Sequence, residues 1–301
     1  MIVTNNLTPD SACRTFFSND IHFASFSNAI LFDGKQVIHS KRLVRYENDT
    51  SFIINDTKTV EDEKRRRDIV VKTDFNGIYC FFGIEHQSSI DQEMVIRCGN
   101  YEMVEYLKQL KNKKLKRLVP QVMIVFYTGD KKWNAPVKLS DYLDVPKELK
   151  AYVNEWRFIF IDVKEIDTSK IKDAQTRYFI EAIQNMYKGN YDKLHRRIKM
   201  NRNNFIYAAI ITGSIDLIKD LPEGDEIDMC EGMERMAEGF RSEGKLEEKR
   251  STLKEQLIIK LGAVSSRLEE QLTNASLEKL NVLTRNIFDI TSEEDVLRII
   301  H

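Results

Sequence analysis

The chain has 301 residues, about twice the length of a typical domain, so its length fits one large domain with additions or two domains. Hydrophobic residues make up 42% of it and charged residues 31%, which is typical of a globular protein that buries a core. The formal net charge of −1 excludes a polycation. Any contact with nucleic acid therefore has to come from a local basic surface.

The cysteines and the apolar runs exclude further classes. Four cysteines are widely spaced, without a CxxC pair or a Cys/His arrangement of the kind that zinc needs, so we expect free thiols. No apolar run approaches the roughly 18 residues of a membrane span. The first ten residues lack the basic and apolar regions of a signal peptide. We therefore expect a cytoplasmic protein that makes no membrane contact.

The first half of the chain alternates helical and extended patterns. Apolar residues recur three and four positions apart in residues 18–32 and 91–117, which predicts two helices. The first of them is followed by a turn at "DGKQ". Runs of β-branched and aromatic residues predict strands, the last two of them fully buried, at 50–55, within 65–87, at 120–129 and at 156–163.

The second half has a different character. From residue 169 onward the periodicity is helical and there is no strong strand candidate. Residues 241–250 are almost all charged or small, which fits a solvated helix or a linker. A leucine pattern after residue 253 fits a packed helix or a contact between copies of the chain. We therefore predict an α/β core at 1–165, a helical region packed on or next to it at 166–240, and a charged linker helix with a helical tail at 241–301, through which a homo-oligomer could form.

Residues 65–87, "RRRDIVVKTDFNGIYCFFGIEHQ", read as two strands that meet at a turn. Asn76-Gly77 is the strongest short signal for a hairpin, because a type I′ turn needs positive φ at both central positions. A two-residue loop pairs Phe75 with Ile78, and the same register places Asp68 opposite Glu85. Since side chains alternate between faces, Gln87 lies on the same face as Glu85.

Two carboxylates placed side by side on a sheet need something to offset their repulsion. A divalent cation would do so, and hard oxygen donors without His or Cys partners favour Mg²⁺, with Mn²⁺ as a substitute. Gly83 would leave room for a ligand to approach the backbone. The alternative is structural, because the three arginines before Asp68 could form surface ion pairs and Glu85 could lie at a solvated strand end.

Other polar and aromatic residues near this hairpin have two interpretations each. Alternation places His86 on the face opposite Glu85, which favours a core or hydrogen-bonding histidine over a catalytic one. Arg97, on the following helix, could contact a phosphate or form an ion pair. Tyr127 and Trp133, at or past the end of the next strand, fit core packing better than contact with a substrate.

Two basic runs, 108–117 and 193–202, are candidates for a DNA surface. Such runs can neutralise phosphates, although on helices they are more often solvated faces. Neither run has the interleaved aromatic residues of a single-strand binding platform, so double-stranded DNA is the preferred partner. The residues that we single out for DNA contact are Arg97, Lys113, Lys114, Arg117, Arg196 and Arg197.

Five separated pieces carry a resemblance to a known family. They lie between residues 28 and 163 and read "NAILFDGKQVI", "RRRDIVVK", "GIEHQSSID", "PQVMIVFYTGDKKWNAP" and "WRFIFIDV". Together they resemble the PD-(D/E)xK nuclease superfamily, and within it the Rpn family of recombination-promoting nucleases and putative transposases. The resemblance implies an α/β, restriction-endonuclease-like core, a central mixed sheet flanked by helices, followed by an all-helical C-terminal region. It also implies a metal-dependent DNA endonuclease that hydrolyses phosphodiester bonds and is associated with recombination or mobile elements.

Carried over to this chain, the resemblance makes Asp68 and Glu85 the metal ligands and places Gln87 where the superfamily has a lysine. Glutamine can orient a water molecule but supplies no positive charge, so slow or conditional cutting is one expectation. A catalytically weak or inactive DNA-binding accessory protein is the alternative. Many members of the superfamily add an acid from the first helix. Here "FASFSN" has serines instead, and Asp20 and Asp33 are the nearby substitutes.

Overall fold

The computed structural model describes residues 7–45, 69–75, 78–111, 116–219 and 221–300. The chain divides into two compact units, residues 1–231 and 232–301. The helices of the first unit are α1 (Pro9–Phe17), α2 (Asp20–Phe32), α3 (Met94–Leu110), α4 (Ala174–Tyr187) and α5 (Arg202–Thr212). Helix α6 (Met229–Leu261) begins in the first unit and continues into the second, which also contains α7 (Ser266–Asn274), α8 (Leu277–Arg285) and α9 (Glu293–Ile300).

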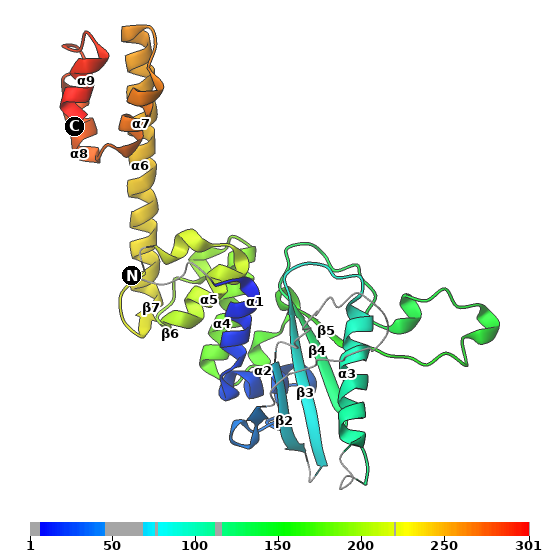
Figure 1. Ribbon diagram of the computed structural model, residues 1–301. Helices are drawn as coiled ribbons and strands as arrows, with labels where there is room; N and C mark the ends of the chain where they lie inside the picture. Colours follow the sequence, from blue (N-terminus) through cyan, green and yellow to red (C-terminus); the bar gives the residue numbers. More distant parts are fainter. Residues whose placement is uncertain (1–6, 46–68, 76–77, 112–115, 220, 301) are drawn as a thin grey trace. The chain divides into compact units, whose positions relative to one another are not determined.

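A mixed sheet of five strands lies at the centre of the first unit (Figure 1). Strands β1, β2 and β3 pair antiparallel, whereas β3, β4 and β5 pair parallel, in the spatial order β1-β2-β3-β4-β5. The bounds of these strands are β1 (Val44–Arg45), β2 (Ile69–Phe75), β3 (Ile78–Gln87), β4 (Gln121–Tyr127) and β5 (Ile159–Asp162). The predicted α/β core with a helical C-terminal region is confirmed.

The hairpin of β2 and β3 has the predicted register. Phe75 pairs with Ile78 and Ile69 pairs with Ile84, as a two-residue loop requires. The loop residues Asn76 and Gly77 themselves lie outside the described residues, as does the strand expected at 50–55.

Both faces of the sheet are covered by helices (Figure 1). Helix α3 packs on one face, where its side chains form a core cluster with Met123 and Val125 of β4 and with Phe158. On the other face Phe126 of β4 contacts Phe17 of α1 and Phe26 of α2, with ring centroids 5.5 and 5.2 Å apart. The two faces therefore present different environments to neighbouring residues of the same strand.

Local sequence signals account for the ends of the first two helices. Helix α1 begins with a capping box in which Thr8 and Ser11 bond to each other's backbone N–H groups. Asn19 caps α2 by accepting hydrogen bonds from two backbone N–H groups. The helix ends at Asp33, which has a φ of 54° in the left-handed region. The helix and turn predicted for 18–32 are therefore confirmed.

Two expectations about strands were wrong. Strand β5 was expected to be fully buried, but Ile159 is exposed and the other three residues are only half-buried, because β5 is the last strand of the sheet. The region after residue 169 was expected to contain no strand, yet β6 (Lys199–Asn201) and β7 (Glu226–Asp228) form a two-stranded sheet. These strands have three residues each, too few for a periodic pattern to be recognised.

The second unit has a core of its own. Buried residues from the C-terminal part of α6 and from α7, α8 and α9 form one cluster that includes Leu257, Leu268, Leu280 and Val296. The charged residues 241–250, for which a helix and a linker were both open, are part of α6. Among the described residues no helix is long and apolar enough to cross a membrane.

Candidate functional site

The candidate site begins at the carboxyl end of β3, where Glu85 and Gln87 follow each other on one face. Glu85 is only 2% exposed and pairs in register with Val125 of β4, on the side that α3 covers. A carboxylate that is removed from water to this extent requires compensating polar partners.

Arg97 of α3 supplies such a partner. Its Nη2 donates to Glu85 Oε1 at 2.8 Å, and its Nη1 donates to Asp91 Oδ2 at 2.5 Å. The Tyr101 hydroxyl lies 3.4 Å from both Arg97 Nη2 and Glu85 Oε1. One guanidinium group thus bridges two carboxylates, one at the end of β3 and one in the loop that precedes α3.

The charges in this cluster stabilise one another. Burial disfavours the ionised form of Arg97, but its hydrogen bonds to Tyr101 and Asp91 and the charge of Glu85 outweigh that effect and raise its pKa above the usual value. The pKa of Tyr101 is raised by burial and by the negative charge of Glu85. Arg97 therefore stays cationic and Tyr101 stays a neutral hydrogen-bond donor.

A second polar network lies on the opposite face of the sheet, at His86. The Nδ1 atom of His86 is 2.6 Å from Asp10 Oδ1, and its Nε2 atom is 2.7 Å from Thr128 Oγ1. Because an ionised carboxylate only accepts hydrogen bonds, we infer that Nδ1 carries the hydrogen. The pKa of Asp10 lies below its usual value, chiefly because of this hydrogen bond. The prediction of a hydrogen-bonded histidine on the face opposite Glu85 is confirmed.

The space over Gly83 is filled by protein, which corrects the expectation that a ligand approaches there. A Cβ atom on Gly83 would lie 2.6 Å from Sδ of Met123 on the neighbouring strand. Gly83 therefore allows β4 to pack its Met123 side chain against β3. Tyr127 and Trp133 pack against each other with ring centroids 5.0 Å apart, so the core interpretation of these aromatic residues is confirmed.

The other residues predicted for the site are dispersed or not described. Asp68, Lys113 and Lys114 lie outside the described residues. The two candidate acids of the first helix have other partners, because Asp20 binds Arg45 at 2.7 Å and Asp33 binds Lys170 at 2.5 Å.

Of the arginines proposed for DNA contact, Arg97 binds Glu85 directly, whereas Arg117, Arg196 and Arg197 are in other parts of the fold. Arg117 precedes the amino end of β4, where the strand pairs with Phe81 of β3. Gln87 pairs with the opposite, carboxyl end of β4. Phe81 and Gln87 of β3 are separated by about 20 Å at the usual rise per residue of a strand. Arg196 binds Glu181 at 2.7 Å, and Arg197 is exposed in the loop before β6.

Two functional groups were missed at the level of sequence. The helical periodicity of residues 91–117 gives Tyr101 no role beyond an apolar helix face, although it lies four residues after Arg97, a spacing at which helical side chains are neighbours. Asp10 could not be found from sequence, because 76 residues separate it from His86.

Together the sheet, its helices and the buried glutamate at a strand end define an α/β protein with a polar site on a central mixed sheet. The chain belongs to the YhgA-like putative transposase family, whose profile matches residues 48–205, more than half of its length. This is the Rpn group of PD-(D/E)xK-like putative transposases, so the resemblance drawn from the sequence is confirmed. No curated protein and no solved structure matches the chain.

Proposed function

We propose that the protein is a metal-dependent DNA endonuclease that hydrolyses phosphodiester bonds, with double-stranded DNA as its partner. Membership of a putative transposase family supports a role in mobile elements and contact with DNA. The observation that carries the proposal is the buried carboxylate of Glu85 at the end of β3, two residues before Gln87 on the same face. Burying a charged carboxylate costs free energy, and a role as a metal ligand would account for an acid at this position.

Asp68 and Glu85 are the proposed ligands of a Mg²⁺ ion, for which Mn²⁺ could substitute. If the observed register extended one residue beyond the Ile69–Ile84 pair, Asp68 would stand opposite Glu85. Within the described residues no three His, Cys, Asp or Glu side chains gather into a metal cluster. Magnesium usually takes only one or two carboxylates and keeps several waters, so these two acids would suffice.

Each residue of this site has a distinct proposed task. Bound Mg²⁺ would supply positive charge to hold the phosphate and to stabilise the negative charge that develops on it. Gln87 would orient the attacking water through its side-chain amide, which donates and accepts hydrogen bonds. The attack would be a direct hydrolysis at phosphorus, without a covalent bond to the protein.

The test is cleavage of supercoiled plasmid in Mg²⁺, Mn²⁺ or EDTA by the wild type and by Glu85→Gln. Glutamine keeps the shape of the side chain but removes its charge. We expect nicking that requires metal and that falls by about a hundredfold or more in Glu85→Gln, because a lost metal ligand removes several kcal/mol of stabilisation. Glu155→Gln, which alters an exposed carboxylate bound to Ser140, is the matched control and should cut like the wild type.

The proposal fails if a folded Glu85→Gln protein retains metal-dependent nicking at the rate of the wild type. Circular dichroism would establish that the variant is folded. Purification through a step that removes host nucleases is needed, because a contaminant would also leave the activity unchanged in the variant.

A DNA-binding accessory protein that does not cut is the second candidate, and the Arg97 contact favours it. The guanidinium already places a cation 2.8 Å from Glu85 Oε1, where it competes with a metal ion for that oxygen. Such a protein would bind duplex DNA in EDTA with the affinity that it has in Mg²⁺ and would nick under neither condition.

A further inference from the structure

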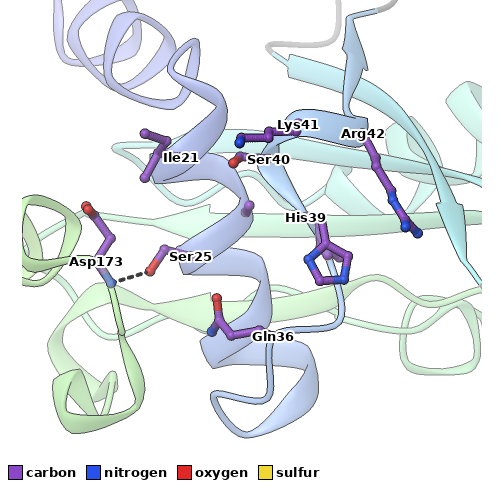
Figure 2. Close-up of a pocket in the computed structure, with 10 residues that line it drawn as sticks. Ile21, Ser25, Gln36, His39, Ser40, Lys41, Arg42 and Asp173 are labelled. Atoms are coloured by element: carbon purple, nitrogen blue, oxygen red, sulfur yellow. Dashed lines mark hydrogen bonds between the residues drawn. The ribbon is translucent and has the colours of Figure 1, made fainter.

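A cavity of about 450 Å³ lies between α2 and residues 36–42 (Figure 2). This volume is within the range of small-molecule pockets. Helix α2 packs through Phe26 against Phe126, on the face of the sheet opposite α3, whereas Glu85 lies on the α3 face. The cavity is therefore separate from Glu85.

The cavity has an apolar floor and a cationic rim. Ala24 and Ile38 are almost fully buried and form the floor. His39, Ser40, Lys41 and Arg42 line it from a single short segment, which Figure 2 shows running alongside α2. The lining thus includes two permanent cations, an imidazole and a hydroxyl group; in Figure 2 the Lys41 side chain lies toward α2 and the Arg42 side chain points to the other side of the segment.

The acid in the lining is already engaged with its own helix. Asp173 caps α4, where its Oδ2 accepts hydrogen bonds at 2.7 Å from both the backbone N–H and the hydroxyl of Thr176. Its backbone N–H donates to Ser25 Oγ at 3.0 Å, the contact drawn in Figure 2. The Asp173 carboxylate therefore caps the amino end of α4 but keeps its negative charge, so the lining carries the two permanent cations Lys41 and Arg42 against one anion.

We propose that this cavity binds a phosphate ester. Arginine recognises phosphate oxygens through its planar fork, lysine adds a point charge, and a serine hydroxyl can donate a further hydrogen bond. The apolar floor would accommodate the sugar or base attached to the phosphate. Because the chain as a whole carries a net charge of −1, this excess of positive charge is a local property of the cavity and not of the whole surface.

The phosphate could belong to a free nucleotide or to DNA, and the experiment separates these sources. Binding of dAMP, of inorganic phosphate and of a fluorescent 12-base-pair duplex is measured with the full chain in EDTA, so that cleavage plays no part. The variants are Lys41→Ala and Arg42→Ala. Lys35→Ala is the control, because it removes the same charge from an exposed neighbour that does not line the cavity.

We expect each cavity variant to weaken binding about tenfold, since a hydrogen bond to a charged group typically accounts for that much. Lys35→Ala should bind like the wild type. Weaker binding of dAMP by the two cavity variants identifies a nucleotide site. Loss confined to the duplex, with a salt dependence reduced by about one phosphate contact, identifies a contact with the DNA backbone.

The proposal is overturned if neither dAMP nor the duplex binds the wild type, or if Lys41→Ala, Arg42→Ala and Lys35→Ala bind alike. All three side chains are exposed, so these variants should fold. A measurement without any variant provides a check: the His39 ring signals in an NMR spectrum should shift on addition of dAMP or duplex, and no shift with either would also contradict the site. These binding results do not change the interpretation of the plasmid assay on Glu85, so the two proposals are tested separately.

Discussion

Arg97 holds two carboxylates at once, and this bridge is the strongest electrostatic feature of the candidate site. Its side chain is 25% exposed, while that of Glu85 is 2% exposed. Glu85 has almost no access to water, so its charge depends on this contact far more than that of Arg97 does.

Replacing Arg97 by alanine should destabilise the fold. Glu85 and Asp91 would lose their shared cation, and removal of one partner from a buried ion pair typically costs about 3 kcal/mol. Urea unfolding at neutral pH measures the change. Arg117→Ala, at an exposed position, is the control and should leave the midpoint in place. An unchanged midpoint for Arg97→Ala would show that Glu85 is stabilised chiefly by other groups.

The contact between Asp10 and His86 predicts a dependence of stability on pH. Hydrogen bonding to His86 lowers the folded-state pKa of Asp10 below its unfolded value of 3.8. The contribution of Asp10 is therefore complete above that value and is lost as the pH falls through the lower folded pKa. Below about pH 4, the advantage of the wild type over Asp10→Asn in unfolding free energy should shrink.

Chemical denaturation at a series of acidic pH values tests this prediction. In a His86→Gln background the Asp10 substitution should show a much weaker dependence on pH, because the partner that lowers the pKa is absent. A difference between wild type and Asp10→Asn that stays constant from pH 5 downwards would count against the network.

At the scale of elements, α3 is positioned by close contact with the loop that leads into β5. A Cβ atom on Gly99 would lie 2.3 Å from the Trp156 ring, shorter than any real contact of this kind. The aromatic ring therefore lies directly against the backbone of the helix that carries Arg97 and Tyr101. A displacement of this ring would be transmitted to the helix.

Two glycine substitutions in helices should therefore have opposite effects. Gly99→Ala should lower the free energy of unfolding by about 1 kcal/mol, because the Trp156 ring has to move. Gly244→Ala in α6, where an added Cβ atom would meet nothing within 4 Å beyond its own helix backbone, should raise it by about 0.5 kcal/mol through helix propensity. Thermal unfolding measures both, and a shift in tryptophan fluorescence should accompany only the first. Stabilisation by Gly99→Ala would mean that the ring moves without cost.

At the scale of the whole molecule, the two units have separate cores that are joined within α6. Between Met236 and Leu253 no described side chain of this helix is buried. The core contacts of this stretch are few, with Leu246 partly buried against the core of the second unit. A helical segment with few core contacts opens locally at low free-energy cost, because few interactions are lost when it does.

Limited trypsin digestion should therefore cut first after Arg241 or Lys245 and leave two persistent fragments. Mass spectrometry identifies the cleavage points. First cuts inside the β2–β5 sheet or between α7 and α9 would contradict the division into two stable units, because both regions contribute to buried cores.

Patterns of short range were sufficient to predict much of the fold. The turn signal at Asn76-Gly77 and strand alternation placed Glu85 and Gln87 on one face and His86 on the other, and helical periodicity located α3. These features depend on neighbours in the chain. The pairing of Asp68 with Glu85 stays a prediction, since Asp68 lies outside the described residues.

Only the tertiary structure decided which distant residues meet. It brought Asp10 to His86, placed Arg97 between Glu85 and Asp91, filled the space over Gly83 with a side chain from β4, and left β5 at the edge of the sheet. The physical reason is that a local pattern specifies the face on which a side chain lies. What occupies the space opposite that face depends on how the elements pack, and this is set by the core as a whole.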